Sequence, residues 1–318
     1  MKRLICILLF ITIYSCHNTI KQDIIITEKD LIPEGVAFNK RTGITYIGST
    51  YKRKIIQIDT TGKNEDFIPE EFEGIWSVLG MEVDEKNNLL WVNTAHANQV
   101  MPLKKPTSNK DWMTNISVFD IDKRKLIKKY PLLEKQAFFN DLTILNDGRI
   151  YVTESVHNRI YTTSFKKDSV SLFVEFKNFT FPNGITYDQT SNMLFISSNQ
   201  GIIKMDPDTK SYMLLKTKGD IDVKVIDGLT FYKNSLIGHQ STKVSRFYLN
   251  DEHTEVINVK TLNSGKEFDS STTGELGNGG DYHFIVNSQI RSGVYKDKKA
   301  LKPMDSLENI IIRKIELQ

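Results

Sequence analysis

The chain has 318 residues, of which 25% are charged and 39% hydrophobic, and its formal net charge is +3. This length suits one large all-β domain or two small ones. Lys2 and Arg3 supply two of the positive charges and no long basic run follows, so no nucleic-acid-binding surface is indicated. The only cysteines, Cys6 and Cys16, lie near the start, which excludes a thiol nucleophile or a cysteine-based zinc site in the remaining chain.

The N-terminal segment has the features of an export signal. After Lys2 and Arg3, residues 4–14 form an apolar stretch that is too short to span a bilayer. Ser15 then precedes Cys16, an arrangement that resembles a bacterial lipobox. We therefore expect residues 1–16 to be a lipoprotein signal peptide, residues 17–23 a tether, and the protein to be lipid-anchored in the cell envelope. An ordinary signal peptide that contains Cys16 is the alternative.

A short motif recurs along the rest of the chain. A small or polar pair leads into a brief apolar strand at Glu34-Gly35, and again five times further on. The later copies begin at Gly80, Asn140, Asn183, Asp227 and, more weakly, Thr273-Gly274. The spacings are 46, 60, 43, 44 and about 47 residues. Repeats of about 40–50 residues with several short strands are typical of propeller blades.

Each motif is followed by a turn and further strands. Second strands are predicted at residues 44–48, 89–93, 149–153, 193–197, 236–238 and 283–287. Third strands are predicted at residues 54–59, 116–121, 159–163, 202–205 and 244–249. The 60-residue spacing indicates a long loop around residues 102–112.

The two ends of the repeat region predict how the ring closes. Residues 309–317 form a strand without a partner, and residues 23–28 form a strand before the first motif. We expect the N-terminal strand to close the last blade. The predicted fold is therefore an all-β, six-bladed β-propeller over residues 24–318.

The motif starts place oxygen donors around one mouth of the central channel. The first strand of a blade runs along the channel, so Glu34, Asn140, Asn183 and Asp227 should meet at one face. Two carboxylates and two amides suit calcium, which accepts such oxygens in flexible geometry together with water. Acidic and amide residues also begin strands simply as turn formers, but four copies in the same register favour a metal site.

Together these motifs resemble the superfamily of calcium-dependent six-bladed propellers that includes gluconolactonase, regucalcin and paraoxonase. The resemblance rests on Pro33-Glu34-Gly35, Phe139-Asn140-Asp141, Pro182-Asn183-Gly184 and Ile226-Asp227-Gly228. It implies that Glu34, Asn140, Asn183 and Asp227 bind one catalytic calcium ion. Gly35 stands where paraoxonases have an aspartate that helps to hold a second ion, which leaves a second, structural ion in doubt although Asp141 is present.

Two histidines follow second strands and should face the same mouth. His96 and His239 resemble positions that line the paraoxonase active site, where one is discussed as a water-activating base. A neutral imidazole accepts a proton near pH 7, although either histidine could equally be a hydrogen-bonding loop residue. His157 and Glu154 are weaker candidates, and His17, His253 and His283 are expected to be structural or exposed.

The sequence departs from these relatives in the stretch before Asn140. Residues 133–139 contain neither the histidine of paraoxonases nor the arginine frequent in regucalcin-type gluconolactonases. Phe138 and Phe139 should make that side of the pocket apolar, and Trp76 and Trp91 either extend this surface or belong to the core.

The expected function is calcium-dependent hydrolysis of a small-molecule lactone or other ester by a monomer. His96, or Asp227 in a second role, would activate water, with His239 as a further catalytic candidate. A non-catalytic binding propeller of the cell envelope is the alternative, and a quinoprotein-type dehydrogenase is a more distant third.

Overall fold

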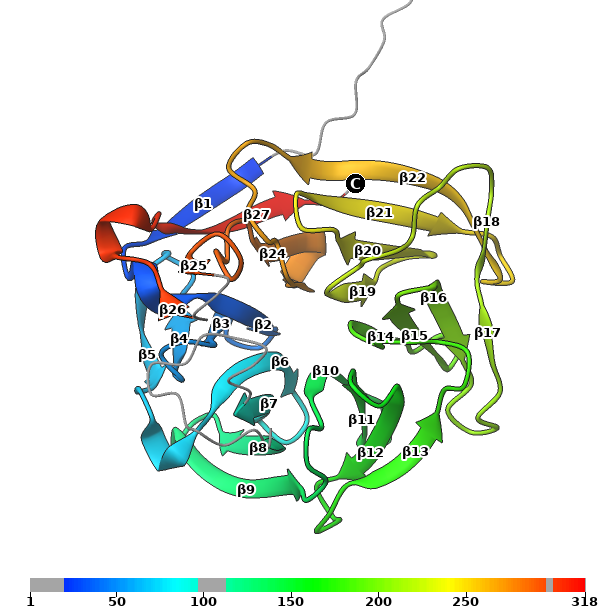
Figure 1. The fold of residues 1–318 in the computed structure, drawn as a ribbon, viewed down its shortest axis with the longest axis horizontal. Coiled ribbons are helices and arrows are strands. Elements are labelled where there is room, and N and C mark those ends of the chain that lie inside the picture. Colours follow the sequence, from blue (N-terminus) through cyan, green and yellow to red (C-terminus); the bar gives the residue numbers. More distant parts are fainter. Residues whose placement is uncertain (1–19, 97–112, 296–299, 318) are drawn as a thin grey trace, which may run out of the picture.

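The computed structural model of the protein describes residues 20–96, 113–295 and 300–317. Six antiparallel sheets stand around a central axis like the blades of a propeller (Figure 1). The predicted all-β, six-bladed fold is thus confirmed. The predicted signal peptide with Cys16 and the loop predicted around residues 102–112 lie outside the described residues. Of the predicted tether, only residues 20–23 are described.

The first three blades each have four strands in chain order from the axis outward. Blade one contains β2 (Pro33–Asn39), β3 (Ile44–Ser49), β4 (Ile55–Ile58) and β5 (Asn64–Ile68). Blade two contains β6 (Ser77–Asp84), β7 (Leu89–His96), β8 (Met113–Asp120) and β9 (Lys125–Leu132). Blade three contains β10 (Phe139–Ile144), β11 (Arg149–Glu154), β12 (Arg159–Ser164) and β13 (Ser171–Glu175).

The last three blades follow the same order with small additions. Blade four contains β14 (Ile185–Asp188), β15 (Met193–Ser198), β16 (Gly201–Met205) and β17 (Tyr212–Leu214). Blade five contains β19 (Leu229–Phe231), β20 (Ser235–His239), β21 (Lys243–Leu249) and β22 (Glu255–Ser264), with β18 (Lys216–Thr217) added in parallel to β22. Blade six contains β23 (Gly274–Leu276), β24 (Asp281–Ile285), β27 (Ile310–Glu316) and β1 (Ile20–Ile26).

The remaining elements are short. A hairpin of β25 (Val294–Tyr295) and β26 (Ala300–Leu301) is inserted between β24 and β27. The described residues form only four 3-10 helices, η1 (Lys29–Leu31), η2 (Phe72–Gly74), η3 (Asn278–Gly280) and η4 (Met304–Ser306). No helix within these residues has the length and apolar character needed to cross a membrane.

The hydrophobic core is divided into six clusters, one between each pair of neighbouring blades. For example, Phe67 of blade one packs with Phe119 of blade two, and Phe247 of blade five packs with Phe195 of blade four. The cluster between blades six and one contains Ile26, Ile310 and Ile47. Because each sheet is apolar on both faces, a blade is buried only when both neighbours are present, so the ring must close.

The N-terminal strand closes the ring as predicted. β1 pairs antiparallel with β27, with Ile26 opposite Ile310 and Ile24 opposite Ile312. Arg313 donates to both carboxylate oxygens of Asp23, at 2.8 and 2.7 Å. The strand begins at Ile20, so part of the expected tether belongs to the sheet, where this ion pair extends the pairing.

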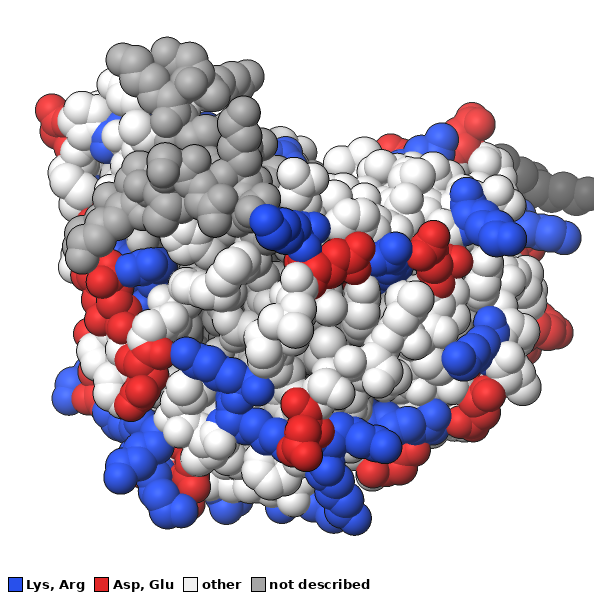
Figure 2. Space-filling view, turned by 60° about the horizontal axis from the view of Figure 1, so that its bottom comes forward, with Lys and Arg blue, Asp and Glu red and all other residues white. Residues whose placement is uncertain are grey.

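The turns between the first two strands of the blades have the backbone conformations that their glycine and asparagine residues favour. Gly43, Asn88, Gly148 and Asn192 all have positive φ, at 76°, 56°, 84° and 56°. Glycine and asparagine adopt this left-handed conformation more readily than other residues. On the face shown in Figure 2, basic and acidic side chains are interspersed around a paler centre.

Candidate functional site

The four predicted oxygen donors meet at one small cavity on the channel axis. Glu34, Asn140, Asn183 and Asp227 all line a space of about 10 Å³. They come from blades one, three, four and five, from residues up to 193 positions apart in the chain. A cavity of this size holds about one water-sized particle, which is the scale of a single ion.

The strand register shows that these donors are equivalent positions. Val36, Leu142, Ile185 and Leu229 each pair with the fourth residue of the neighbouring strand. Each donor lies two residues before that pairing position. The same count in the other two blades, from Met81 and Gly274, gives Leu79 and Thr272. These six positions form a ring, which we call the donor ring: Glu34, Leu79, Asn140, Asn183, Asp227 and Thr272.

The register corrects two of the predicted motif starts. In blade two the position equivalent to Glu34 is Leu79, not Gly80, and in blade six it is Thr272, not Thr273. Gly80 corresponds to Gly35, the residue after the donor, so the residue before Gly80 takes the place of Glu34. Blade two therefore contributes no side-chain oxygen at this level, because Leu79 is apolar and buried.

Glycines follow the donors and bring the inner strands together. A Cβ atom on Gly184 would lie 2.4 Å from the Asp227 carbonyl oxygen, and one on Gly80 would lie 2.4 Å from the Asp141 Oδ1 atom. The Gly184 N–H also donates to the Asp227 carbonyl at 2.8 Å. Only glycine permits this approach, so the inner strands pack closely together directly after the donor ring.

The backbone is strained just before the donors. Ile32, Phe181, Val225 and Ser270 lie two residues before Glu34, Asn183, Asp227 and Thr272, and their φ angles are 43°, 55°, 52° and 54°. Positive φ is especially unfavourable for the β-branched Ile32 and Val225. Such strain persists only where the surrounding structure enforces it, and it concentrates at functional sites.

Hydrogen bonds orient the two amide side chains. The Asn140 Nδ2 atom donates to Ser155 Oγ at 3.1 Å, and the Asn183 Nδ2 atom donates to Asp227 Oδ1 at 2.9 Å. Each amide nitrogen is thereby occupied, which leaves the Oδ1 oxygen as the atom that could contact a cation.

Burial makes the carboxyl groups reluctant to ionise. Burial raises the pKa of Glu34 well above its usual value, and the neighbouring Asp227 and Asp141 raise it further. Burial likewise raises the pKa of Asp227 to about 6, against the lowering effects of the Asn183 hydrogen bond and Arg291. Burial also raises the pKa of Asp141 to about 7. None of the three has an ion-pair partner among the described residues, so a bound cation would relieve their repulsion.

The donor set suits calcium better than a transition metal. Within the described part of the chain, no three His, Cys, Asp or Glu side chains are grouped to hold a metal ion. A site here would depend on two carboxylates, two amide oxygens and water, which calcium accepts and which zinc, with its preference for imidazole and thiolate, does not.

The structure does not support a catalytic role for His239. Its side chain is fully buried, with Nδ1 2.9 Å from Ser271 Oγ and Nε2 2.8 Å from the Tyr282 hydroxyl. Burial lowers its pKa to about 3. Its carbonyl oxygen accepts a hydrogen bond from the Asp227 N–H at 2.8 Å, so His239 supports the donor ring from below and does not face the mouth.

His96 ends β7 and does not line the ion-sized cavity. Its ring packs edge-on against Trp76 at 6.0 Å between centroids. Burial, and secondarily the charge of Arg53, lower its pKa, which keeps the imidazole neutral near pH 7. A neutral imidazole suits a general base, but His96 does not contact the cavity that the donor ring lines.

The other sequence candidates are structural. Glu154 is fully buried and accepts hydrogen bonds from the N–H groups of Phe138, Val156 and His157. It therefore holds the turn that follows β11 in place. Phe138, Phe139 and Trp91 are also buried and line none of the cavities described here. The expectation that the two phenylalanines form an apolar pocket wall stays a prediction.

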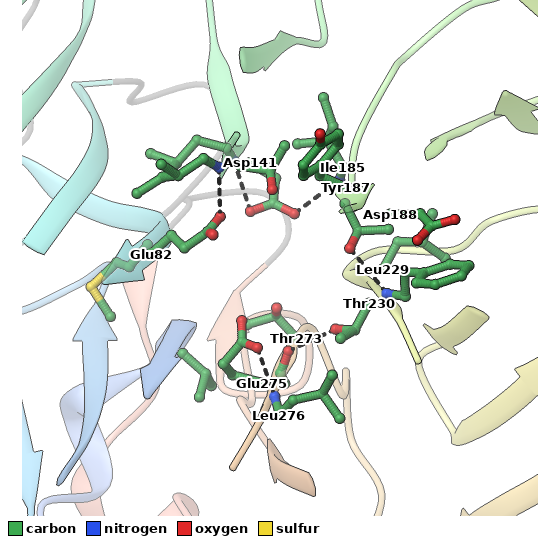
Figure 3. Close-up of a pocket in the computed structure, with 18 of the residues that line it drawn as sticks. Glu82, Asp141, Ile185, Tyr187, Asp188, Leu229, Thr230, Thr273, Glu275 and Leu276 are labelled. Carbon is green, nitrogen blue, oxygen red and sulfur yellow. Dashed lines mark hydrogen bonds between the residues drawn. The ribbon is translucent and has the colours of Figure 1, made fainter. Parts of the chain in front are cut away.

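A larger cavity of about 330 Å³ is lined by residues that lie further along the inner strands than the donor ring. Figure 3 shows the side chains around it. Glu82 and Glu275 line it, and Asp141 lines both cavities. The Asp141 carboxylate accepts the Ile185 N–H at 3.1 Å, and Glu82 accepts the Ile144 N–H at 3.1 Å. These carboxylates thus connect neighbouring inner strands. The sequence held a signal for this polar lining, because the residue three positions after each donor-ring position is polar in five of six blades: Glu82, Thr143, Thr186, Thr230 and Glu275.

A third cavity, of about 100 Å³, adjoins the donor ring between blades four, five and six. Asn183 and Asp227 line it as well as the ion-sized cavity. Arg291, in the loop after β24, also lines it. This arginine was missed in the sequence because it lies in an irregular segment outside the repeated motif.

Comparison with known proteins supports the fold. No protein-family model and no curated protein matches the chain. Among solved structures, a gluconolactonase from Xanthomonas campestris is similar, with a TM-score of 0.61 and 12% identity over 89% of this chain and 86% of that one. The Malassezia sympodialis allergen Mala s 1 has a TM-score of 0.68 and 15% identity over 94% and 97%. A PQQ-bound aldose sugar dehydrogenase from Streptomyces coelicolor has a TM-score of 0.60 and 11% identity over 94% and 97%. At these identities the chain shares the propeller fold of gluconolactonase-like proteins.

Proposed function

We propose that this protein is a calcium-dependent hydrolase of a lactone or another ester, with one ion held at the donor ring. The observation that carries the proposal is the meeting of Glu34, Asn140, Asn183 and Asp227 at a single ion-sized cavity. The fold shared with a gluconolactonase agrees with this chemistry, although that likeness alone defines only the architecture.

The carboxylates and the amides of the donor ring would have different roles in binding the ion. Glu34 and Asp227 would supply the negative charge that holds the ion, and Asn140 and Asn183 would supply neutral oxygens. A bound calcium ion supplies a Lewis acid that polarises a carbonyl group. Asp227 lines both the ion-sized cavity and the adjoining one, so it is placed to accept a proton from water beside a substrate. His96 remains a second candidate base that a variant can test.

Calcium binding and hydrolysis can be measured separately. Isothermal titration calorimetry should detect about one calcium per chain, as one donor cluster implies. A panel of lactones and aryl esters should be hydrolysed with calcium and not after chelation. Glu34→Gln should weaken both calcium binding and hydrolysis, because it removes one of the two charged donors.

A matched control is available in the same channel. Glu275 is also a half-buried carboxyl group with a raised pKa but does not line the ion-sized cavity, so Glu275→Gln should leave calcium affinity unchanged. Calcium binding without cleavage of any lactone or ester would indicate a non-catalytic binding propeller. Absence of calcium binding would refute the metal site itself.

We further propose that the protein acts as a monomer in the cell envelope, anchored through Cys16. The basis is the lipobox-like segment of the sequence.

A further inference from the structure

The cavity beside the donor ring has the position of a substrate subsite. It measures about 100 Å³, and two of its lining residues, Asn183 and Asp227, also face the ion-sized cavity. A molecule bound there would therefore lie against the proposed ion. The volume is below the range of roughly 300–1,000 Å³ typical of pockets for drug-sized ligands, which favours a compact ring or a short acyl chain.

One wall of this cavity is apolar and exposed. The side chains of Phe181 and Val225 line it and are 43% and 70% exposed. Both have positive φ, at 55° and 52°, and neither is packed into the core. The fold therefore presents two apolar side chains at the mouth on strained backbone, which is a feature of binding sites rather than of ordinary turns.

Arg291 adds a positive charge to the lining of this cavity. This exposed arginine lines the same cavity, and its guanidinium group donates a long 3.4 Å hydrogen bond to Ser241 Oγ. Other arginines of the described chain are engaged more fully. Arg159, for example, donates to both Glu134 and Glu175, and Arg313 donates to both Asp23 and Glu267.

Arg291 has no carboxylate partner within ion-pair distance among the described residues, although Asp227 feels its charge. Most of its donors are thus available to a ligand. A guanidinium group presents parallel N–H donors that match a planar carboxylate.

Building on the proposed function, we propose that this cavity binds the substrate beside the ion and that Arg291 binds a carboxylate carried by that substrate. The substrate class is then a lactone or ester with a free carboxylate group, such as a lactone formed by a sugar diacid. Phe181 and Val225 contact the carbon skeleton, and Arg291 orients the reacting carbonyl toward the donor ring.

A matched pair of lactones tests this assignment. One lactone carries the free carboxylate, and the other carries a primary amide in its place, so that the two differ in charge but hardly in shape. Wild-type protein should show a higher kcat/KM for the carboxylate lactone by about tenfold to a hundredfold, the range expected for one charge-assisted hydrogen-bonded contact. Arg291→Gln should abolish this preference mainly by raising KM for the carboxylate lactone, whereas an effect through Asp227, whose pKa Arg291 lowers, would change hydrolysis of both lactones alike.

Arg41→Gln is the control for loss of a surface arginine. Arg41 lies in the turn of blade one, beside Asn88 and Asp122, and its replacement should preserve the preference. The preference is the kcat/KM for the carboxylate lactone divided by that for the amide lactone. If this preference is the same in wild type and in Arg291→Gln, the proposal is overturned.

Equilibrium binding separates this proposal from the proposed function. Calorimetry of the calcium-loaded protein with each lactone, or with its hydrolysed acid if the lactone is consumed, should show an Arg291-dependent affinity for the carboxylate form. If no lactone is hydrolysed, the proposed function fails, and the binding result still decides the role of Arg291. A Kd for the carboxylate form that Arg291→Gln leaves unchanged would overturn the subsite.

Discussion

Replacement of Asp227 by asparagine should make the empty donor ring more stable while it weakens calcium binding. The Asp227 carboxyl group is half-buried beside Glu34 and accepts a hydrogen bond from Asn183. Asparagine has nearly the same shape, and its amide oxygen can accept the same hydrogen bond. The substitution therefore removes a charge with little change in packing.

The magnitude follows from the raised pKa. The pKa of Asp227 is about 6 in the folded protein, against an ordinary value of 3.8. This difference of about 2.2, at about 1.36 kcal/mol per pKa unit, corresponds to at most about 3 kcal/mol. Because the folded state binds the proton more tightly, this contribution to stability is complete below about pH 4 and is lost as pH rises through 6.

Urea unfolding in calcium-free buffer at pH 4.5 and pH 8 measures the effect. The wild-type free energy of unfolding should fall between these values, and Asp227→Asn should fall less, so the variant should be more stable at pH 8 by up to about 3 kcal/mol. Added calcium should restore wild-type stability by mass action and should affect the variant far less.

The control is Asp220→Asn, at an exposed position, which should change neither curve. The reasoning is refuted if Asp227→Asn is no more stable than wild type in calcium-free buffer at pH 8. It is equally refuted if the variant keeps the full stabilisation by calcium, because Asp227 would then not be a ligand.

Two further predictions concern the channel backbone and the anchor. Gly184→Ala places a Cβ atom 2.4 Å from the Asp227 carbonyl oxygen; it should cost about 1–3 kcal/mol as an overpacked site and weaken calcium binding, measured by urea unfolding and calorimetry. Unchanged stability would show that the inner strands can move apart. Cys16→Ala should move the protein from the membrane fraction to the soluble fraction, and retention at the membrane would contradict lipid anchoring.

Much of the fold follows from local sequence pattern. Short β-branched and aromatic runs between turn residues identify the strands, and Gly43, Asn88 and Gly148 lie in the turns between them with positive φ. The closing pair of β1 and β27 was predictable because a terminal strand without a neighbour leaves an open edge.

The errors arose where a one-residue register or a distant contact decides the outcome. Gly80 matches Gly35, the residue after the donor, so the apolar Leu79 lies at the donor level, one residue before the predicted motif start. His239 resembles a mouth residue in its own repeat. It is buried because Ser271 and Tyr282, which lie 32 and 43 positions later, bind both of its ring nitrogens. No local pattern carries that information.

The donor ring is held by features that lie outside the ring itself. Its oxygens follow strained residues such as Ile32 and Val225 and precede glycines that press neighbouring strands together. Neither feature stabilises the fold by itself, and the buried carboxyl groups repel one another. The six apolar clusters between blades must therefore offset this cost. A site that is unfavourable for folding and complementary to a cation is expected where binding requires fixed donors. For this reason substitutions in the ring should separate stability from calcium affinity, whereas substitutions in the clusters should lower both together.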